Sequence, residues 1–108
     1  LDLQLMIIYN VTSCIDIAVY QKWLDWMQKE HIPAMLNTGK FFNARMVKVL
    51  DDQDPDSVTF SVQYYTSSKE MLERYYAEDA PRLRQESAAL FADKILQFRT
   101  ELEIISEH

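Results

Sequence analysis

The residues with the clearest potential for chemistry lie near the end of one apolar segment. Glu30 and His31 are adjacent, and Pro33 follows them closely. A histidine titrates near neutral pH, so beside a carboxylate it can act as a general acid or base. Adjacent residues on a helix point about 100° apart, however, and a histidine before a proline can equally bond a carbonyl group or face water. Glu30 and His31 are therefore catalytic candidates that have a purely structural alternative.

Aromatic side chains could form the walls of a pocket beside this pair. Ligand pockets are mostly apolar with a few polar groups, which suits a flat substrate. Tryptophans at helical spacing also serve as core residues, and a buried tyrosine hydroxyl needs a hydrogen-bond partner. The candidates for ligand contact are Tyr9, Trp23, Trp26, Tyr64, Tyr75 and Tyr76.

The elements that must position these residues can be read from the periodicity of apolar side chains. Four stretches alternate between apolar and polar residues, which predicts β-strands, and two stretches have the helical period. The predicted order is strand, helix, strand, strand, helix, strand. The strands are expected at residues 5–12, 41–50, 58–65 and 95–105.

Capping residues and prolines predict where the first helix begins and ends. Ser13 or Asp16 can accept a hydrogen bond from the first free backbone N–H groups. Pro33 cannot donate the hydrogen bond of a continuing helix, so we expect a break or kink near His31. Gly39 favours the left-handed conformation that ends many helices.

The second helical stretch is also expected to consist of two pieces. Ser67 and Glu70 have the spacing of a capping box, which predicts the start of the first piece. Asp79 can cap the second piece, with Pro81 in its first turn. Its buried stripe is expected to contain Leu83, Leu90 and Phe91.

This order predicts an α+β fold of the ferredoxin-like βαββαβ type, with a four-stranded antiparallel sheet and two kinked helices on one face. The residues expected to face the helices are Ile7, Tyr9, Met46, Phe60, Val62 and Phe98. A second copy of the sheet is expected to cover the other face, because a two-fold axis lets one patch complement itself. The residues expected in this homodimer interface are Ile8, Asn10, Arg45, Val47, Gln63, Tyr65, Arg99 and Glu101.

Composition excludes several classes of function. Hydrophobic residues make up 48% of the chain and charged residues 26%, which is typical of a folded globular protein. The net charge is −6 and the basic residues are scattered, so we expect no nucleic-acid partner. Neither a bilayer-spanning apolar run nor a signal sequence is evident, so we expect no membrane partner and a cytoplasmic location.

Few residues suit metals or disulfides, and the chain has the length of one domain. Cys14 is the single cysteine, and the two histidines lie far apart, so we expect neither a disulfide nor a metal site. Residues 6–108 are expected to form a single domain. Residues 1–5 precede Met6 and are expected to be an added remnant or an upstream extension.

Three segments give the chain a specific resemblance. With the predicted order of elements, WLDWMQKEHIPAMLNTGKF, VQYY and ERYYAEDAPRLR resemble a bacterial family known as a domain of unknown function, over essentially the whole chain from Met6. More broadly, the chain resembles the dimeric α+β barrel superfamily. That resemblance implies two ferredoxin-like subunits joined through their sheets, and a pocket between sheet and helices.

The superfamily includes antibiotic-biosynthesis monooxygenases, heme-degrading monooxygenases, small isomerases or lyases, and members without known catalysis. The heme-degrading relatives combine an asparagine on the first strand with a tryptophan and a histidine in the second helical region. Asn10 fits, but the second helix of this chain offers Tyr75 and Tyr76 and no histidine, so we expect no heme and no other cofactor. Three functions stay open: a homodimer that binds a small molecule or a protein, a cofactor-independent monooxygenase or isomerase acting on an aromatic molecule, and a structural interaction domain.

Overall fold

One antiparallel sheet and one layer of helices make up the protein. The computed structural model describes residues 6–108, so Leu5 and the expectation for residues 1–5 lie outside the described residues. The strands are β1 (Ile7–Asp16), β2 (Asn43–Lys48), β3 (Ser57–Thr66) and β4 (Ile95–Glu103). They pair in the order β2-β3-β1-β4, and every neighbouring pair is antiparallel. The predicted ferredoxin-like βαββαβ fold is confirmed.

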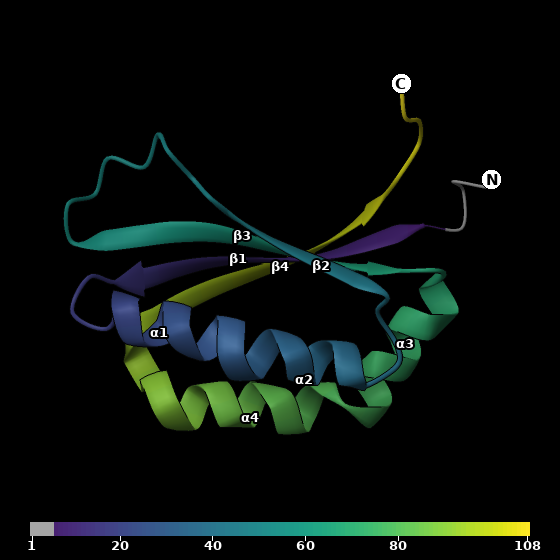
Figure 1. Ribbon diagram of the computed structural model, residues 1–108, viewed down its shortest axis with the longest axis horizontal. Helices are drawn as coiled ribbons and strands as arrows, with labels where there is room; N and C mark the ends of the chain where they lie inside the picture. Colours follow the sequence, from purple (N-terminus) through teal and green to yellow (C-terminus); the bar gives the residue numbers. More distant parts are fainter. Residues whose placement is uncertain (1–5) are drawn as a thin grey trace.

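The helices all lie on one face of the sheet, as Figure 1 shows. The first helical run consists of α1 (Tyr20–Trp26), a π-helical segment (Met27–His31) and α2 (Ile32–Asn37). The second consists of α3 (Lys69–Glu78) and α4 (Ala80–Phe91), and a 3₁₀ turn (Ala92–Lys94) leads into β4. The opposite face of the sheet, which we call the open face, carries no helix in the described part of the chain (Figure 1).

The first helical run does not break at the proline. It continues from α1 to α2 through the π-helical segment, and Pro33 lies in the first turn of α2, where its missing N–H is tolerated. The predicted break near His31 is therefore replaced by a local change of helix type. Gly39 follows the end of α2 with φ of 77°, as the prediction of a glycine cap requires.

Two of the predicted helix starts differ from the structure. β1 extends to Asp16, so Ser13 lies inside the strand, while the Asp16 carboxylate accepts a bond from the Ala18 N–H at 2.8 Å. The cap of α3 is Ser68 and not Ser67, because the Ser68 hydroxyl accepts the N–H of Met71. Both differences arise because a neighbouring serine or aspartate can fill the same role.

The core lies between the sheet and the helices. β1 and β3 contribute alternate residues to it, and Trp23 and Leu83 anchor the two helical runs. Leu90 is 46% exposed, so the buried stripe of α4 differs from the predicted one. That stripe consists of Ala80, Leu83, Ser87 and Phe91.

The two faces of β4 are the reverse of those predicted. Arg99 pairs with Val11 and Glu101 pairs with Tyr9, and both partners point toward the helices. Phe98 pairs with Thr12 on the open face and is 59% exposed. Arg99 and Glu101 therefore belong to the helix side, and the predicted placement of Phe98 in the core is wrong.

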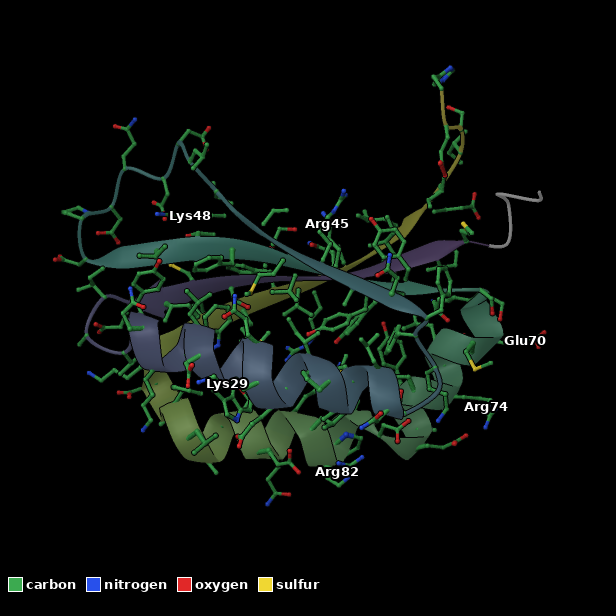
Figure 2. The ribbon with its side chains drawn as sticks, viewed as in Figure 1. Lys29, Arg45, Lys48, Glu70, Arg74 and Arg82 are labelled. Carbon is green, nitrogen blue, oxygen red and sulfur yellow. The ribbon has the colours of Figure 1, made fainter. Side chains whose placement is uncertain are left out.

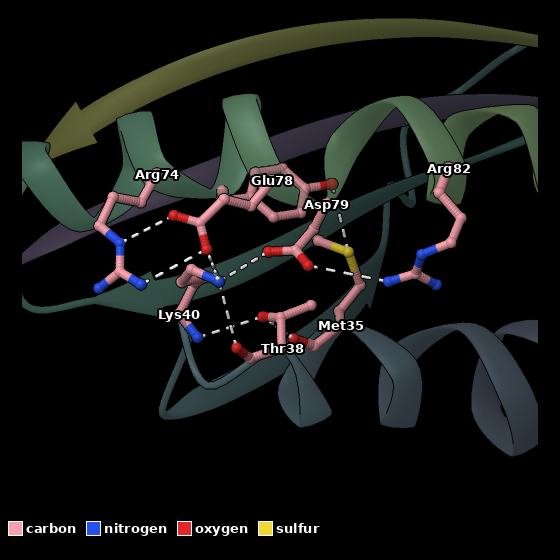
Figure 3. A network of polar contacts seen from close by, with 8 residues as sticks. Met35, Thr38, Lys40, Arg74, Glu78, Asp79 and Arg82 are labelled. Atoms are coloured by element: carbon pink, nitrogen blue, oxygen red, sulfur yellow. Dashed lines mark hydrogen bonds and ion pairs between the residues drawn. The ribbon is translucent and has the colours of Figure 1, made fainter.

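A buried lysine ties the end of the first helical run to the second (Figure 3). The Lys40 side chain is 8% exposed, and its Nζ lies 2.8 Å from the Asp79 carboxylate and 3.2 Å from that of Glu78. It also donates to the Thr38 carbonyl at 3.3 Å. Asp79 is thus engaged by Lys40, and its side chain makes no capping bond to α4.

Candidate functional site

Tyr9 lies at the centre of an aromatic cluster on the helix side of β1. Alternation along β1 points its side chain toward the helices, and only 1% of it is exposed. The ring centroids of Phe41, Tyr64, Tyr75 and Tyr76 lie 5.5 to 6.1 Å from that of Tyr9. Four of the six predicted aromatic residues, from β1, β3 and α3, thus lie in one cluster together with Phe41.

Two arginines converge on the Tyr9 hydroxyl. Arg84 of α4 donates to it from Nη2 at 3.1 Å, and Arg99 of β4 donates from Nε at 3.1 Å. Arg99 also donates to the Gln97 side-chain oxygen at 3.2 Å. Arg84 lies over the ring of Tyr76, 5.8 Å from its centroid. We call Arg84 and Arg99 the arginine pair.

A small cavity of about 30 Å³ lies beside Tyr9, between the sheet and the helices. It has room for about two water molecules. Its lining residues are Tyr9, Val11, Ser13, Trp26, Met27, His31, Met35, Val62, Tyr64, Tyr75, Leu83, Arg84, Ser87, Gln97 and Arg99.

A wider surface cleft of about 250 Å³ adjoins this cavity, between α4 and β4. The two hollows share Arg84, Ser87, Gln97 and Arg99. These shared residues form a polar wall, whereas the deeper part of the cavity is mostly aromatic and aliphatic. We call this hollow the α4–β4 cleft.

His31 reaches the cavity from the π-helical segment. Its ring stacks on Trp26 with centroids 4.7 Å apart. Its Nδ1 is buried and has no hydrogen-bond partner among the described residues. Burial lowers the pKa of His31 from its usual value of 6.5 to about 4. The imidazole is therefore neutral at neutral pH. Depending on the tautomer, Nδ1 either donates or accepts a hydrogen bond in the cavity.

Glu30 does not share this cavity. It is exposed and lines a separate surface hollow with Lys22, Leu90 and other residues. Trp26 borders both hollows and lies between them. The structure therefore does not bring the two predicted catalytic residues into one pocket.

The predicted aromatic ligand contacts divide into two groups. Tyr9, Trp26, Tyr64 and Tyr75 line the cavity. Burial raises the pKa of Tyr64 and Tyr75 above the ordinary range, so their hydroxyls stay protonated and cannot act as bases at neutral pH.

Trp23 and Tyr76 lie outside the cavity lining. Trp23 is fully buried and packs on Phe60 with centroids 5.2 Å apart, which makes it a core residue. The Tyr76 hydroxyl donates to the Glu101 carboxylate at 2.6 Å. Burial, followed by this hydrogen bond, raises the pKa of Tyr76.

Sequence reasoning did not find the polar wall of the site. Arg84, Ser87 and Gln97 were not candidates, and Arg99 was assigned to the other face. One signal was available in the sequence. Ser87 lies at helical spacing from the apolar residues Ala80, Leu83 and Phe91, so a polar side chain points into the otherwise apolar buried stripe of α4.

The open face carries a hydrogen-bonded network across its middle. Arg45 donates to the Gln63 oxygen at 3.0 Å, and Gln63 donates to Ser61 at 3.2 Å. Ser61 donates to Asn10 at 2.6 Å, and the Asn10 amide donates to the Thr100 hydroxyl at 3.1 Å. Figure 2 shows Arg45 on the side of the sheet away from the helices.

Six of the predicted interface residues lie on the open face. The strand register places Ile8 opposite Tyr65 and Asn10 opposite Gln63. It also places Arg45 beside Gln63 and Val47 beside Ser61. Apolar side chains flank the polar network: Val47, Leu96, Phe98 and Leu102 are between 39% and 59% exposed.

Residues 6–108 contain neither a metal-binding cluster nor a membrane-spanning helix. No cluster of three or more histidine, cysteine, aspartate or glutamate side chains that could hold a metal ion occurs there. None of the helices in that range combines the length and apolar character needed to cross a bilayer.

Solved structures with this fold are similar in shape and distant in sequence. A dimeric ferredoxin-like protein from an uncultured marine organism matches with a TM-score of 0.71 at 10% identity, covering 95% of this chain and 99% of that chain. A Bacillus cereus protein provisionally assigned as an antibiotic biosynthesis monooxygenase has a TM-score of 0.66 at 12% identity, with coverage of 95% and 96%. A dimeric ferredoxin-like protein of unknown function from Thermobifida fusca has a TM-score of 0.60 at 14% identity, with 96% of each chain covered. These likenesses show the fold.

The family comparison is more specific. The comparison with curated proteins gave no match. A family model described as a domain of unknown function (DUF4286) matches residues 6–105, which is nearly the whole chain. The chain therefore belongs to the DUF4286 family.

Proposed function

We propose that the protein is a homodimeric binding domain whose two copies join through their open faces and whose α4–β4 cleft takes a small molecule. The observation that carries the dimer is the row of large apolar side chains along β4. Leu96, Phe98 and Leu102 lie on the open face, with Thr100 between the last two, and are 59%, 59% and 43% exposed. A contiguous apolar patch on a sheet face favours coverage by another surface.

The size and chemistry of the open face suit a second copy. Four strands of this length cover on the order of 600 Å², which is close to the roughly 800 Å² that each partner buries in a standard interface. The polar network in its middle is already hydrogen-bonded within one chain, which reduces the cost of burying it. Two of the similar solved structures are described as dimeric ferredoxin-like proteins, which supports the same assembly here.

The mass of the protein in solution tests the dimer. Light scattering after size exclusion should give twice the 12.8 kDa of one chain for the wild type. Phe98→Lys should shift the protein toward the monomer, because a charge would be buried without a partner at the two-fold interface. Leu90→Lys is the matched control, since Leu90 is 46% exposed but lies on α4.

Two results would refute the dimer. A wild-type mass of one chain at tens of micromolar protein would show that the open face stays uncovered. An unchanged dimer in Phe98→Lys would place the interface elsewhere.

Small-molecule binding is supported by the α4–β4 cleft and the cavity behind it. The cleft measures about 250 Å³ and its polar wall continues into the helix–sheet layer. A fragment screen by nuclear magnetic resonance on the full chain tests this part. Fragments should shift the backbone resonances around Ser87 and Gln97. A diverse set that leaves those resonances unmoved would rule the cleft out as a binding site.

The enzyme alternative finds less support in the site. A monooxygenase or isomerase for an aromatic molecule fits the fold of the Bacillus cereus structure. The cavity beside His31 measures about 30 Å³, however, whereas an engineered cavity that holds benzene measures about 150 Å³, so an aromatic ring does not fit next to His31. None of the described residues that line this cavity with His31 carries a carboxylate. A cytoplasmic location stays a prediction from the sequence.

A further inference from the structure

The arginine pair brings two positive charges to a single tyrosine hydroxyl. Arg84 and Arg99 both donate to Tyr9 at 3.1 Å. Within residues 6–108, neither guanidinium forms an ion pair with a carboxylate. Like charges this close repel, so an anion placed against both of them would be attracted strongly. The chain has an excess of acidic residues, yet none of those within residues 6–108 pairs with either arginine.

The acidic residue nearest to Arg99 on the same face of β4 is committed elsewhere. Glu101 lies two positions beyond Arg99, but one of its oxygens pairs with Lys69 and the other accepts the Tyr76 hydroxyl at 2.6 Å. The Lys69 and Tyr76 hydrogen bonds lower the pKa of Glu101, so it stays ionised and bound to them. The charge of the arginine pair is therefore left for another anion.

Hydrogen-bond donors remain available at the site. A guanidinium has five N–H donors, of which Arg99 uses two and Arg84 one in the contacts with Tyr9 and Gln97. The Tyr9 hydroxyl accepts both arginines, and its own hydrogen has no acceptor among the described residues. Unused guanidinium donors match the acceptor oxygens of a carboxylate or a phosphate.

The space beside these donors is open on one side. The α4–β4 cleft, of about 250 Å³, is bordered by both arginines, Ser87 and Gln97. Because a cavity of about 150 Å³ holds benzene, the cleft has room for one ring with its acidic group. Its size suits a small molecule rather than a polymer.

We infer that the α4–β4 cleft binds a small organic anion whose carboxylate or phosphate group is held between Arg84 and Arg99. The inference rests on the proposal that this cleft takes a small molecule, and it adds the chemical class of that molecule. The Tyr9 hydroxyl, held by both arginines, fixes their separation and lies at the base of the site.

Three probes of similar size test the inference on the full wild-type chain. Benzoate carries a carboxylate, phenyl phosphate carries a phosphate, and benzamide is a neutral analogue of benzoate. Dissociation constants come from resonance shifts of Ser87 and Gln97 at low salt. We expect one of the two anions to bind at least tenfold more tightly than benzamide, as a charge-assisted hydrogen bond would give. The tighter anion identifies the acidic group.

Arginine variants provide the second arm. Arg84→Gln and Arg99→Gln should each weaken binding of the preferred anion about tenfold or more, and should weaken binding of neutral benzamide much less. Arg82→Gln is the control, because Arg82 lies on the same helix but pairs with Asp79 and Glu86. Circular dichroism confirms that each variant is folded. Equal weakening by Arg82→Gln would overturn the inference.

The wild-type measurement decides the matter even if a variant unfolds. Benzamide binding in the cleft as tightly as both anions would overturn the anion inference and leave small-molecule binding intact. If neutral fragments shift the resonances of Ser87 and Gln97 and neither anion does, the anion inference is likewise overturned and small-molecule binding stands. Only the failure of every probe and every fragment would remove the proposed function as well.

Discussion

Protonation of His31 should destabilise the folded protein as the pH falls below neutral. Burial lowers the pKa of His31 to about 4 in the folded chain, whereas the unfolded chain keeps a value of about 6.5. Between these two values the unfolded chain binds more protons than the folded one. The stabilising contribution of the neutral imidazole is therefore fully present above pH 6.5 and is lost as the pH falls toward 4.

The magnitude follows from the difference between the two pKa values. Each pH unit between them corresponds to about 1.4 kcal/mol, so the unfolding free energy should fall by about 2 kcal/mol per chain from pH 7 to pH 5 and by about 3 kcal/mol below pH 4. Above pH 5, protonation of carboxylates contributes little to this loss of unfolding free energy. Glu101, for example, has its pKa lowered by the hydrogen bonds from Lys69 and Tyr76, so its contribution is lost only at more acidic pH.

Urea unfolding at pH 7, 6 and 5, followed by tryptophan fluorescence at one protein concentration, measures this loss. The unfolding free energy of the wild type should fall between pH 7 and pH 5, and that of His31→Asn should hardly change. His108→Asn is the control, since His108 is exposed at the end of the chain. Equal pH dependence in the wild type and His31→Asn would refute the reasoning, as would a His31 pKa near 6.5 by nuclear magnetic resonance titration.

Two further substitutions test how the end of the first helical run is held. Gly39→Ala should lower the unfolding free energy by about 1 kcal/mol, because φ is +77° even though an added Cβ would meet no atom within 4 Å; an unchanged urea midpoint would show that the turn relaxes. Lys40→Met should lower the thermal midpoint, since Asp79 is only 14% exposed and loses its nearest cation. Lys29→Met removes an exposed pair with Asp25 and should change the midpoint little. Equal effects of the two lysine variants would contradict a structural role for Lys40.

Much of the fold could be predicted because its signals are local. The alternation of Tyr64 and Tyr65 already separates the core face from the open face of β3, and the register of β3 with β1 confirms it. Gly39 ends its helix as predicted. The start of α3 was missed by one residue, since Ser67 and Ser68 offer the same hydroxyl to the same turn.

The faces of β4 could not be predicted from its sequence. Alternation shows that Phe98 and Arg99 point in opposite directions, but not which direction leads to the helices. The apolar set was expected inside because a core attracts apolar side chains. In the structure, polar residues take the inner side because Arg99 reaches the Tyr9 hydroxyl and Glu101 reaches Tyr76.

The candidate site was predicted in part. His31 and Trp26 meet at the cavity because they lie within one helical run. The separation of Glu30 from that cavity depends on how the helix is rotated against the sheet, which side-chain packing decides.

The sequence by itself determined the order of the elements, the antiparallel sheet and the aromatic character of the layer beneath it, because periodicity and capping act over a few residues. Tertiary structure decided that Arg84 and Arg99 meet at Tyr9, across 75 and 90 residues of chain. Such contacts depend on strand register and on the packing of α4, and a shift of one residue in register would turn Arg99 to the other face.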